Sequence, residues 1–226
     1  MTIEIGFLVF PRVQQLDLTG PYEVLAMLPG ARVHLVAREM GPIPSVTGLA
    51  LTPTVDFAGC PALDVICVPG GGGVNPLMED AETLGFLRRQ AERARYVTSV
   101  CTGALVLGAA GLLRGRRATT HWAAHDLLAA FGAIPTEGRV VRDGNLVTGG
   151  GVTAGIDFGL TLAAELTDEA TARAIQLHLE YAPAPPFDAG RPETAGPEIL
   201  AIARERLAAT RREREAIVAR MARAGR

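Results

Sequence analysis

The sequence predicts an α/β domain built on a mostly parallel sheet. Short apolar runs alternate along the chain with longer amphipathic stretches, which is the pattern of consecutive strands and helices. The runs Ile3–Phe10 and Asp64–Pro69 are almost continuously apolar, as parallel strands buried on both faces are. With 226 residues, 48% of them hydrophobic, the chain is long enough to bury one full core.

The first third of the chain predicts two strands and the helix between them. Ile3–Phe10 is the first strand, and Asp17-Leu-Thr-Gly-Pro21 starts a helix with Pro21 at the first helical position. That helix continues to Leu28, and 31–37 is the second strand. Residues 41–58 are rich in proline and glycine and predict a loop with short edge strands.

The middle of the chain continues the alternation. The strand at 64–69 runs into four consecutive glycines, Gly70–Gly73, and a helix follows. The expected elements are a helix at 80–94, a strand at 96–100, a helix at 102–110, a strand at 116–120 and a helix at 122–131.

The last third predicts a hairpin and three more helices. Asp143-Gly144 between two short β-branched runs is a type I′ hairpin signal. Helices follow at 153–166 and 167–181, and Ala182-Pro-Ala-Pro-Pro186 then breaks the pattern. Gly196-Pro197 opens an Arg- and Glu-rich helix that runs to the C-terminus. We therefore expect an α/β domain over 1–181, and over 182–226 a linker and a helix that docks on the body or on a partner subunit.

Composition excludes several functions. The net charge of −2 favours neither nucleic acid nor a membrane surface as a partner, and no apolar run approaches the ~18 residues of a membrane span. Three irregularly spaced cysteines and an N-terminus without a cleavage signal predict a cytoplasmic protein. All 22 basic residues are arginine, which excludes a catalytic or phosphate-binding lysine, and only two serines are present.

Cys101 is the strongest candidate nucleophile. It lies between a predicted strand and a predicted helix, with the small residues Ser99 and Gly103 two positions to either side. That spacing is the one of a nucleophile elbow, and the helix N-terminus behind the sulfur is expected to lower the pKa of the thiol. A cysteine taken alone is more often a small buried hydrophobe, so this prediction depends on the spacing.

Other chemistry-bearing groups follow neighbouring strand ends, where ligands bind in open parallel sheets. Asp17 after the first strand acts either as a helix cap or as an acid/base beside the thiol. Gly70–Gly73 lacks the residues of a P-loop, so it is either a tight turn or a set of N–H donors for a developing negative charge. Gly149–Gly151 lies at a fourth strand end, and Thr102 either caps its helix or offers a free N–H.

His121 and His125 are four residues apart, as in a zinc-binding helix, but Trp122 stands where such a helix has its glutamate. No third ligand is evident, so the sequence predicts no metal; instead His121 and Trp122 are candidates to line the pocket. Cys67, within a buried strand, and Cys60, in a loop, lack an activating context.

Five motifs together resemble the PfpI superfamily of the class I glutamine-amidotransferase-like fold. They are Asp17-Leu-Thr-Gly-Pro-Tyr-Glu23, Pro69-Gly-Gly71, Ser99-Val-Cys-Thr-Gly103 with the Ala-Ala-Gly-Leu-Leu that follows, and Arg117-Ala-Thr-Thr-His-Trp122. The resemblance covers about residues 3–181. It implies a flavodoxin-like three-layer sandwich with the cysteine at an elbow, a homodimer, and activity without a metal or an organic cofactor.

The residues at two motif positions narrow the expected activity. The protease-like branch of the superfamily has a glutamate after the first strand and a histidine after the cysteine, where this chain has Asp17 and Thr102. A Cys-His triad is therefore not expected. The motifs are most similar to those of the superfamily's isonitrile-hydrating enzymes, whose cysteine stands in this Val-Cys-Thr-Gly context near an aspartate.

The resemblance implies a mechanism and a set of residue roles. Cys101 would attack the carbon of a small isonitrile, Asp17 would act as acid and base, and a thioimidate would be hydrolysed to an N-substituted formamide. The backbone N–H groups of Gly71 and Thr102, with Gly150 as a further donor, would stabilise the developing charge.

Two alternatives keep Cys101 as the reactive group: glyoxalase or deglycase action on reactive carbonyls, and a non-enzymatic ligand or redox sensor. The same signature occurs in AraC-type transcription regulators, but those carry a helix-turn-helix pair of about a hundred residues. Only some 45 residues follow Tyr181 here, so DNA binding is not expected.

Overall fold

A computed structural model describes residues 2–224 of the chain and the side chains of residues 2–221. Its centre is a seven-stranded sheet in the order β10-β11-β7-β6-β1-β2-β5, parallel throughout except for β10, which pairs antiparallel with β11. The strands are β1 (Ile3–Leu8), β2 (Ala31–Ala37), β5 (Val55–Asp56), β6 (Val65–Val68), β7 (Tyr96–Val100), β10 (Val140–Asp143) and β11 (Leu146–Gly149).

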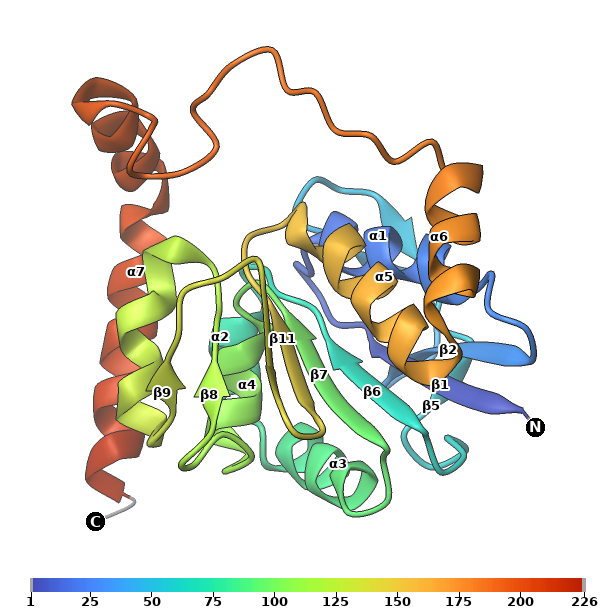
Figure 1. Cartoon of the computed structure of the whole chain (residues 1–226). Helices are drawn as coiled ribbons and strands as arrows, with labels where there is room; N and C mark the ends of the chain where they lie inside the picture. Colours follow the sequence, from blue (N-terminus) through green and yellow to red (C-terminus); the bar gives the residue numbers. More distant parts are fainter. Residues whose placement is uncertain (1, 225–226) are drawn as a thin grey trace.

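Helices cover both faces of this sheet, which confirms the predicted three-layer sandwich (Figure 1). The two layers enclose separate apolar cores, one on each side of the sheet. One face carries α1 (Gln15–Leu25), α5 (Ala154–Leu166) and α6 (Glu169–His178); the other carries α2 (Val74–Leu77), α3 (Ala81–Ala91), α4 (Gly103–Ala109) and the 3-10 helix η1 (Trp122–Phe131).

The strand order places a switch point between β1 and β6. From β1 the chain crosses to β2 on one side, and it then returns to form β6 and β7 on the other side. The order β2-β1-β6-β7-β11 is the flavodoxin-like one, in which ligands bind beyond the carboxyl ends of the strands that flank the switch. The predicted site residues follow these strand ends.

Helix α1 begins earlier than predicted, at Gln15, so Pro21 lies inside the helix and not at its first position. The prediction was wrong because it read Pro21 as a start signal, whereas here the ring serves packing against α5. A Cβ on Gly155 would lie 3.0 Å from Cδ of Pro21, and one on Gly159 would lie 3.2 Å from its Cα. The two helices therefore approach closely, and glycines of α5 face Pro21 where larger side chains would collide with it.

The short strands lie outside or at the edge of the main sheet. Residues 41–58 form a loop with edge strands as predicted: β3 (Ile43–Pro44) and β4 (Ala50–Leu51) pair with each other, and β5 joins the main sheet. The predicted strand at 116–120 is reduced to β8 (Arg117–Ala118), which pairs with β9 (Ile134–Pro135) in a separate sheet.

The predicted hairpin is present as β10 and β11, but its turn is not type I′. Asp143 pairs with Leu146, so Gly144 and Asn145 are the central residues. Gly144 has a φ of 58°, whereas Asn145 is not among the residues at positive φ. Type I′ requires positive φ at both central positions, and glycine at the first position alone suits type II′.

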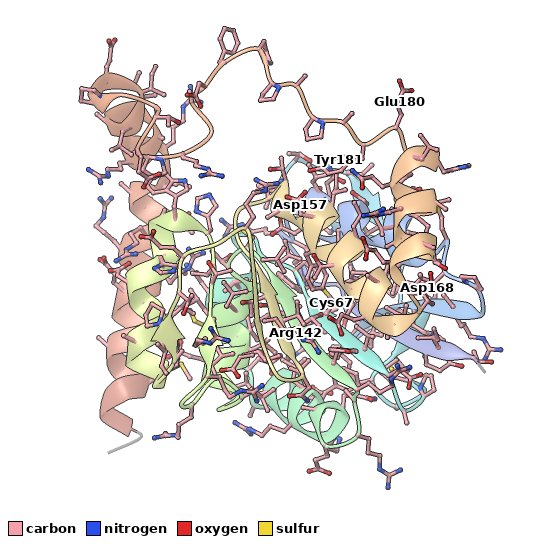
Figure 2. The ribbon with its side chains drawn as sticks, in the orientation of Figure 1. Cys67, Arg142, Asp157, Asp168, Glu180 and Tyr181 are labelled. Carbon is pink, nitrogen blue, oxygen red and sulfur yellow. The ribbon has the colours of Figure 1, made fainter. Side chains whose placement is uncertain are left out.

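The last helix, α7 (Pro197–Ala224), lies on the side of the body that carries η1, and a long exposed segment leads to it (Figure 1). The body before this segment ends at Tyr181, whose hydroxyl donates to Oδ1 of Asp157 at 2.9 Å and ties the chain after α6 to α5 (Figure 2). Within residues 2–224, no helix combines the length and apolarity needed to cross a membrane.

Candidate active site

The candidate site is built where β1, β6 and β7 end. Each strand delivers one component: β1 leads to α1 with Asp17, β6 to the turn that starts at Gly70, and β7 to Cys101. A Cβ placed on Gly70 would lie 2.7 Å from three atoms, Oδ2 of Asp17 and the backbone nitrogen and Oγ1 of Thr102. The three strand ends therefore meet within a few ångströms, and only glycine fits between them.

Cys101 has the backbone of a nucleophile elbow, as predicted. Its φ is 55°, in the left-handed region that residues other than glycine adopt rarely and at a cost. Two hydrogen bonds hold the turn: the Cys101 N–H donates to the carbonyl of Gly149 at 3.0 Å, and Oγ1 of Thr120 donates to the Cys101 carbonyl at 2.7 Å. A Cβ on Gly103 would overlap the carbonyl oxygen of Val68, so the close approach of α4 to β6 requires glycine there.

Asp17 is a fully buried carboxyl in the first turn of α1. It does not cap the helix: Gln14 is at the N-cap, and the Gly70 N–H donates to Oδ2 of Asp17 at 2.9 Å. Burial raises the pKa of Asp17 from 3.8 to about 7, although the Gly70 N–H and the nearby Cys101 thiol act in the opposite direction. Among the described residues, Oδ1 has no partner with the geometry of a regular hydrogen bond, so it is free to exchange a proton.

The pKa of the Cys101 thiol is raised well above its ordinary value, first by burial and then by the negative charge of Asp17. The Thr102 N–H at the start of α4 lowers it, as predicted for a helix N-terminus, but burial outweighs that effect. The predicted effect of the helix N-terminus is therefore present, but burial decides the net pKa of the thiol. At rest the site holds a thiol beside a carboxyl group that titrates near neutrality.

The N–H groups of Gly71 and Gly150, predicted to be free donors, already have acceptors within the protein. The Gly71 N–H donates to Oγ1 of Thr102 at 3.1 Å, and the Gly150 N–H donates to the carbonyl of Arg139 at 2.8 Å. The Thr102 hydroxyl consequently does not cap α4, where the structure has no side-chain cap. Of the three expected donors, the Thr102 N–H is the one that acts on the sulfur.

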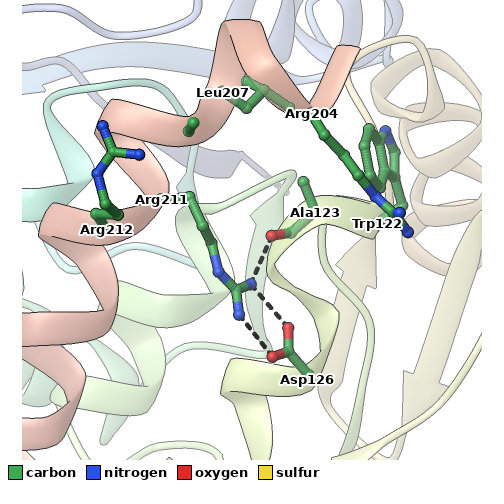
Figure 3. Close-up of a pocket in the computed structure, with 8 residues that line it drawn as sticks. Trp122, Ala123, Asp126, Arg204, Leu207, Arg211 and Arg212 are labelled. Carbon is green, nitrogen blue, oxygen red and sulfur yellow. Dashed lines mark hydrogen bonds and ion pairs between the residues drawn. The ribbon is translucent and has the colours of Figure 1, made fainter. Parts of the chain in front are cut away.

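His121 and Trp122 lie beside each other, but the cavity that Trp122 lines includes neither Cys101 nor Asp17 among its lining residues. Nδ1 of His121 accepts from the Ala123 N–H at 3.2 Å, so a proton on the neutral ring belongs to Nε2. Burial, with the charge of Arg214 second, lowers the pKa of His121 to about 4. Trp122 lines a cavity of about 420 Å³ between η1 and α7, where Arg211 bonds to the Ala123 carbonyl and to Asp126 (Figure 3).

The remaining candidates for metal or thiol chemistry do not join the site. His125 contacts the carbonyl of Thr136 at 3.1 Å, and the described residues contain no cluster of three or more side chains suited to hold a metal. Burial raises the pKa of Cys60 to about 11 and that of Cys67, in the middle of the sheet (Figure 2), to about 12. Both thiols therefore stay protonated at neutral pH.

One residue at the site was missed from the sequence: Arg214 of α7. It is only 7% exposed, and its charge acts on both Cys101 and His121. The signal was its position, one helical turn before Ile217 and Val218, which α7 buries against the body. The apolar spacing places Arg214 on the face of α7 that is buried against the body.

Comparison with known proteins shows which family the chain resembles. The model of the DJ-1/PfpI family matches residues 4–165. Isonitrile hydratase from Pseudomonas putida is 65% identical over 98% of this chain and 97% of its own length. The crystal structure of a THiJ/PfpI family protein from Pseudomonas syringae superposes with a TM-score of 0.94 at 47% identity, covering 96% of this chain and 91% of that one.

A regulator also matches, over part of its length. An HTH-type transcriptional regulator from Pseudomonas aeruginosa is 33% identical over 70% of this chain, which corresponds to 45% of the regulator. The sequence motifs, the switch-point site and these matches agree on one assignment. The chain belongs to the DJ-1/PfpI family.

Proposed function

We propose that this protein hydrates isonitriles to N-substituted formamides. The observation that carries the proposal is the 65% identity, over nearly the whole of both chains, to an isonitrile hydratase. The site supports it, because Cys101 and the buried Asp17 lie next to each other at neighbouring strand ends, as a nucleophile and an acid/base.

The first step adds the thiol across the isonitrile carbon, which is electrophilic and also carries a lone pair. The proton of Cys101 passes to Oδ1 of Asp17 as the sulfur forms a bond to carbon, and Asp17 then delivers that proton to the same carbon. The product is a thioimidate with a C=N bond, and no other reactant is consumed. Because Oδ1 lacks a regular hydrogen bond among the described residues, it can take and give the proton without breaking an existing contact.

The second step hydrolyses the thioimidate. Asp17, as its carboxylate, takes a proton from a water molecule while the water oxygen adds to the thioimidate carbon, and Asp17 passes that proton to the nitrogen. The hydroxyl group of the resulting tetrahedral adduct then loses its proton through Asp17 to the sulfur as the carbon–sulfur bond breaks, which regenerates the Cys101 thiol and releases the N-substituted formamide. A carboxyl with a pKa of about 7 is suited to both roles, since it gives and accepts protons near neutral pH.

The neighbouring groups are proposed to support these steps in different ways. The Thr102 N–H stabilises the sulfur as it becomes negative, and its hydroxyl orders the Gly71 backbone. Gly71 and Gly150 shape the site through their backbones. Their N–H groups are used within the protein, so this role is narrower than the predicted one of donating to the substrate.

The test is the product formed from n-butyl isonitrile. We expect N-butylformamide, and intact-protein mass spectrometry of quenched samples is expected to show a thioimidate adduct on Cys101. Cys101→Ser is expected to abolish turnover and Asp17→Asn to reduce it strongly, with Cys60→Ser as the matched control of unchanged activity. Consumption of methylglyoxal without consumption of the isonitrile would instead identify a carbonyl-directed enzyme.

We further propose that the protein works as a homodimer in the cytoplasm. The three thiols are free, which suits a reducing compartment. Large apolar side chains are exposed at the end of α6, in the linker and in the first turns of α7, and such side chains are typical of an association surface: Leu177, Phe187, Ile199 and Ile202. Light scattering coupled to size-exclusion chromatography measures the mass, and a monomer at micromolar concentration would refute this part.

A further inference from the structure

Arg214 is a buried charge at the edge of the site. Among the Asp, Glu, His and Arg side chains that the structure describes, Asp17 and Arg214 are the two that are buried. The charges of both affect the Cys101 thiol. They come from opposite ends of the sequence, on α1 and α7. Burial of an arginine is costly unless a partner compensates its charge, so its location calls for a physical reason.

Asn75 fixes the orientation of this arginine. Nε of Arg214 donates to Oδ1 of Asn75 at 3.0 Å, and Nδ2 of Asn75 donates to Glu213 at 2.8 Å and to the carbonyl of Thr210 at 3.2 Å. Asn75 is fully buried in α2, directly after the Gly70–Gly73 turn that binds Asp17. The guanidinium is therefore held by the same segment that orders the carboxyl of the site.

The charge of Arg214 has no carboxylate partner within residues 2–221. The other arginines that dock α7 do have one: Arg211 pairs with Asp126 and Arg220 pairs with Glu79. The charged or titratable groups that act on Arg214 are Cys101, Arg211 and Glu213, and Arg214 in turn acts on His121. His121 is neutral at pH 7, and of the remaining groups Cys101 is the one that becomes negative during the reaction.

We propose that Arg214 is a positioning residue whose guanidinium stabilises the thiolate of Cys101, so that α7 completes the site formed by the α/β body. Its part in turnover rests on the proposed hydratase function, whereas its action on the thiol does not. A neutral thiol at rest gains negative charge when its proton moves to Asp17, and a fixed cation in a water-poor site favours that transfer. The alternative is that Arg214 only anchors α7 through Asn75.

The experiment measures the rate of Cys101 alkylation by iodoacetamide against pH, read by peptide mass spectrometry so that Cys60 and Cys67 are counted separately. Arg214→Met removes the charge and keeps the apolar stem. We expect about a tenfold slower alkylation of Cys101 at each pH below the pKa of its thiol, which corresponds to a rise of about one pKa unit. Arg214→Lys keeps the charge and is expected to recover most of the rate.

Arg220→Met is the matched control. It removes an arginine from the same helix and breaks an ion pair between α7 and the body, but its side chain is exposed and pairs with the carboxylate of Glu79, so no buried charge is removed. We expect wild-type alkylation from this variant. An Arg214→Met protein that is folded by circular dichroism and alkylates at the wild-type rate would overturn the proposal. If that variant does not fold, Arg214→Gln takes its place, because its amide N–H can still donate to Asn75 but carries no charge. A tenfold slower alkylation of Cys101 then supports the proposal, and the wild-type rate overturns it.

Turnover separates this inference from the proposed function. If the protein hydrates n-butyl isonitrile, Arg214→Met is expected to lower kcat about tenfold and leave KM nearly unchanged, because the charge acts in the transition state. If the wild type does not hydrate isonitriles but its alkylation still depends on Arg214, the hydratase proposal fails and the role of Arg214 stands.

Discussion

The unusual pKa of Asp17 makes the stability of the protein depend on pH in a way that one substitution can isolate. Asp17 is fully buried, and its pKa rises from 3.8 to about 7 on folding. A carboxyl whose pKa is higher in the folded than in the unfolded protein favours folding only while it is protonated. The loss of stability from ionising Asp17 in the folded state is therefore absent below pH 3.8. It grows as the pH rises from 3.8 to about 7 and is constant above that.

The difference between the unfolded and the folded pKa of Asp17 sets how much unfolding free energy is lost. A shift of this size corresponds to about 4 kcal/mol of lost stability above pH 7, of which about 3 kcal/mol develops between pH 5 and pH 8. Asp17→Asn cannot ionise and escapes this cost. Its amide leaves a buried N–H near the thiol, which adds a penalty of about 1–3 kcal/mol that does not change with pH.

The assay is urea unfolding of the wild type and Asp17→Asn at pH 5, 6, 7 and 8. We expect the unfolding free energy of the variant to rise relative to that of the wild type by about 3 kcal/mol from pH 5 to pH 8. Asp168→Asn serves as a control, because the pKa of this exposed N-cap carboxyl is lowered and not raised. A difference between Asp17→Asn and wild type that stays flat over this range would refute the raised pKa, and with it the assignment of Asp17 as a neutral-pH proton donor.

Three further outcomes test the site. Below a pH of about 7 the thiol–carboxyl pair holds two protons and lacks a base, so kcat/KM for n-butyl isonitrile is expected to fall about tenfold per pH unit; a flat acidic limb would contradict this. Gly103→Ala forces a Cβ into the Val68 carbonyl and is expected to cost about 3 kcal/mol or more in thermal unfolding, whereas Gly85→Ala, where the nearest atom is 3.5 Å away, is expected to be neutral or stabilising by up to about 1 kcal/mol. Thr102→Val leaves the Gly71 N–H without its acceptor and is expected to lose about 1 kcal/mol in urea unfolding, and Thr102→Ser to retain it; equal losses would exclude a role for the hydroxyl.

Much of the fold was predictable because the signals are local. The continuous apolar run of β1 shows that both of its faces are buried, and Gly196-Pro197 marks the start of α7 to the residue. The small residues around Cys101 predicted the elbow, since a sharp strand-to-helix turn needs small neighbours whatever the rest of the fold is. Where the local signal was ambiguous the prediction failed, as with Pro21, which reads equally well as a helix start and as a packing residue.

The sequence by itself determined the order of strands and helices, the candidate nucleophile at its turn, and the strand ends that carry the other groups. The tertiary structure alone decided how these groups behave. Asp17 became a near-neutral acid because packing removes it from water, and the Gly71 N–H found its acceptor 31 positions away. Arg214 reached the site through a contact with Asn75 that spans 139 positions. Apolar spacing can indicate that a side chain is buried, but which residues meet across such distances depends on how the layers pack, and no periodicity or turn motif encodes those partners.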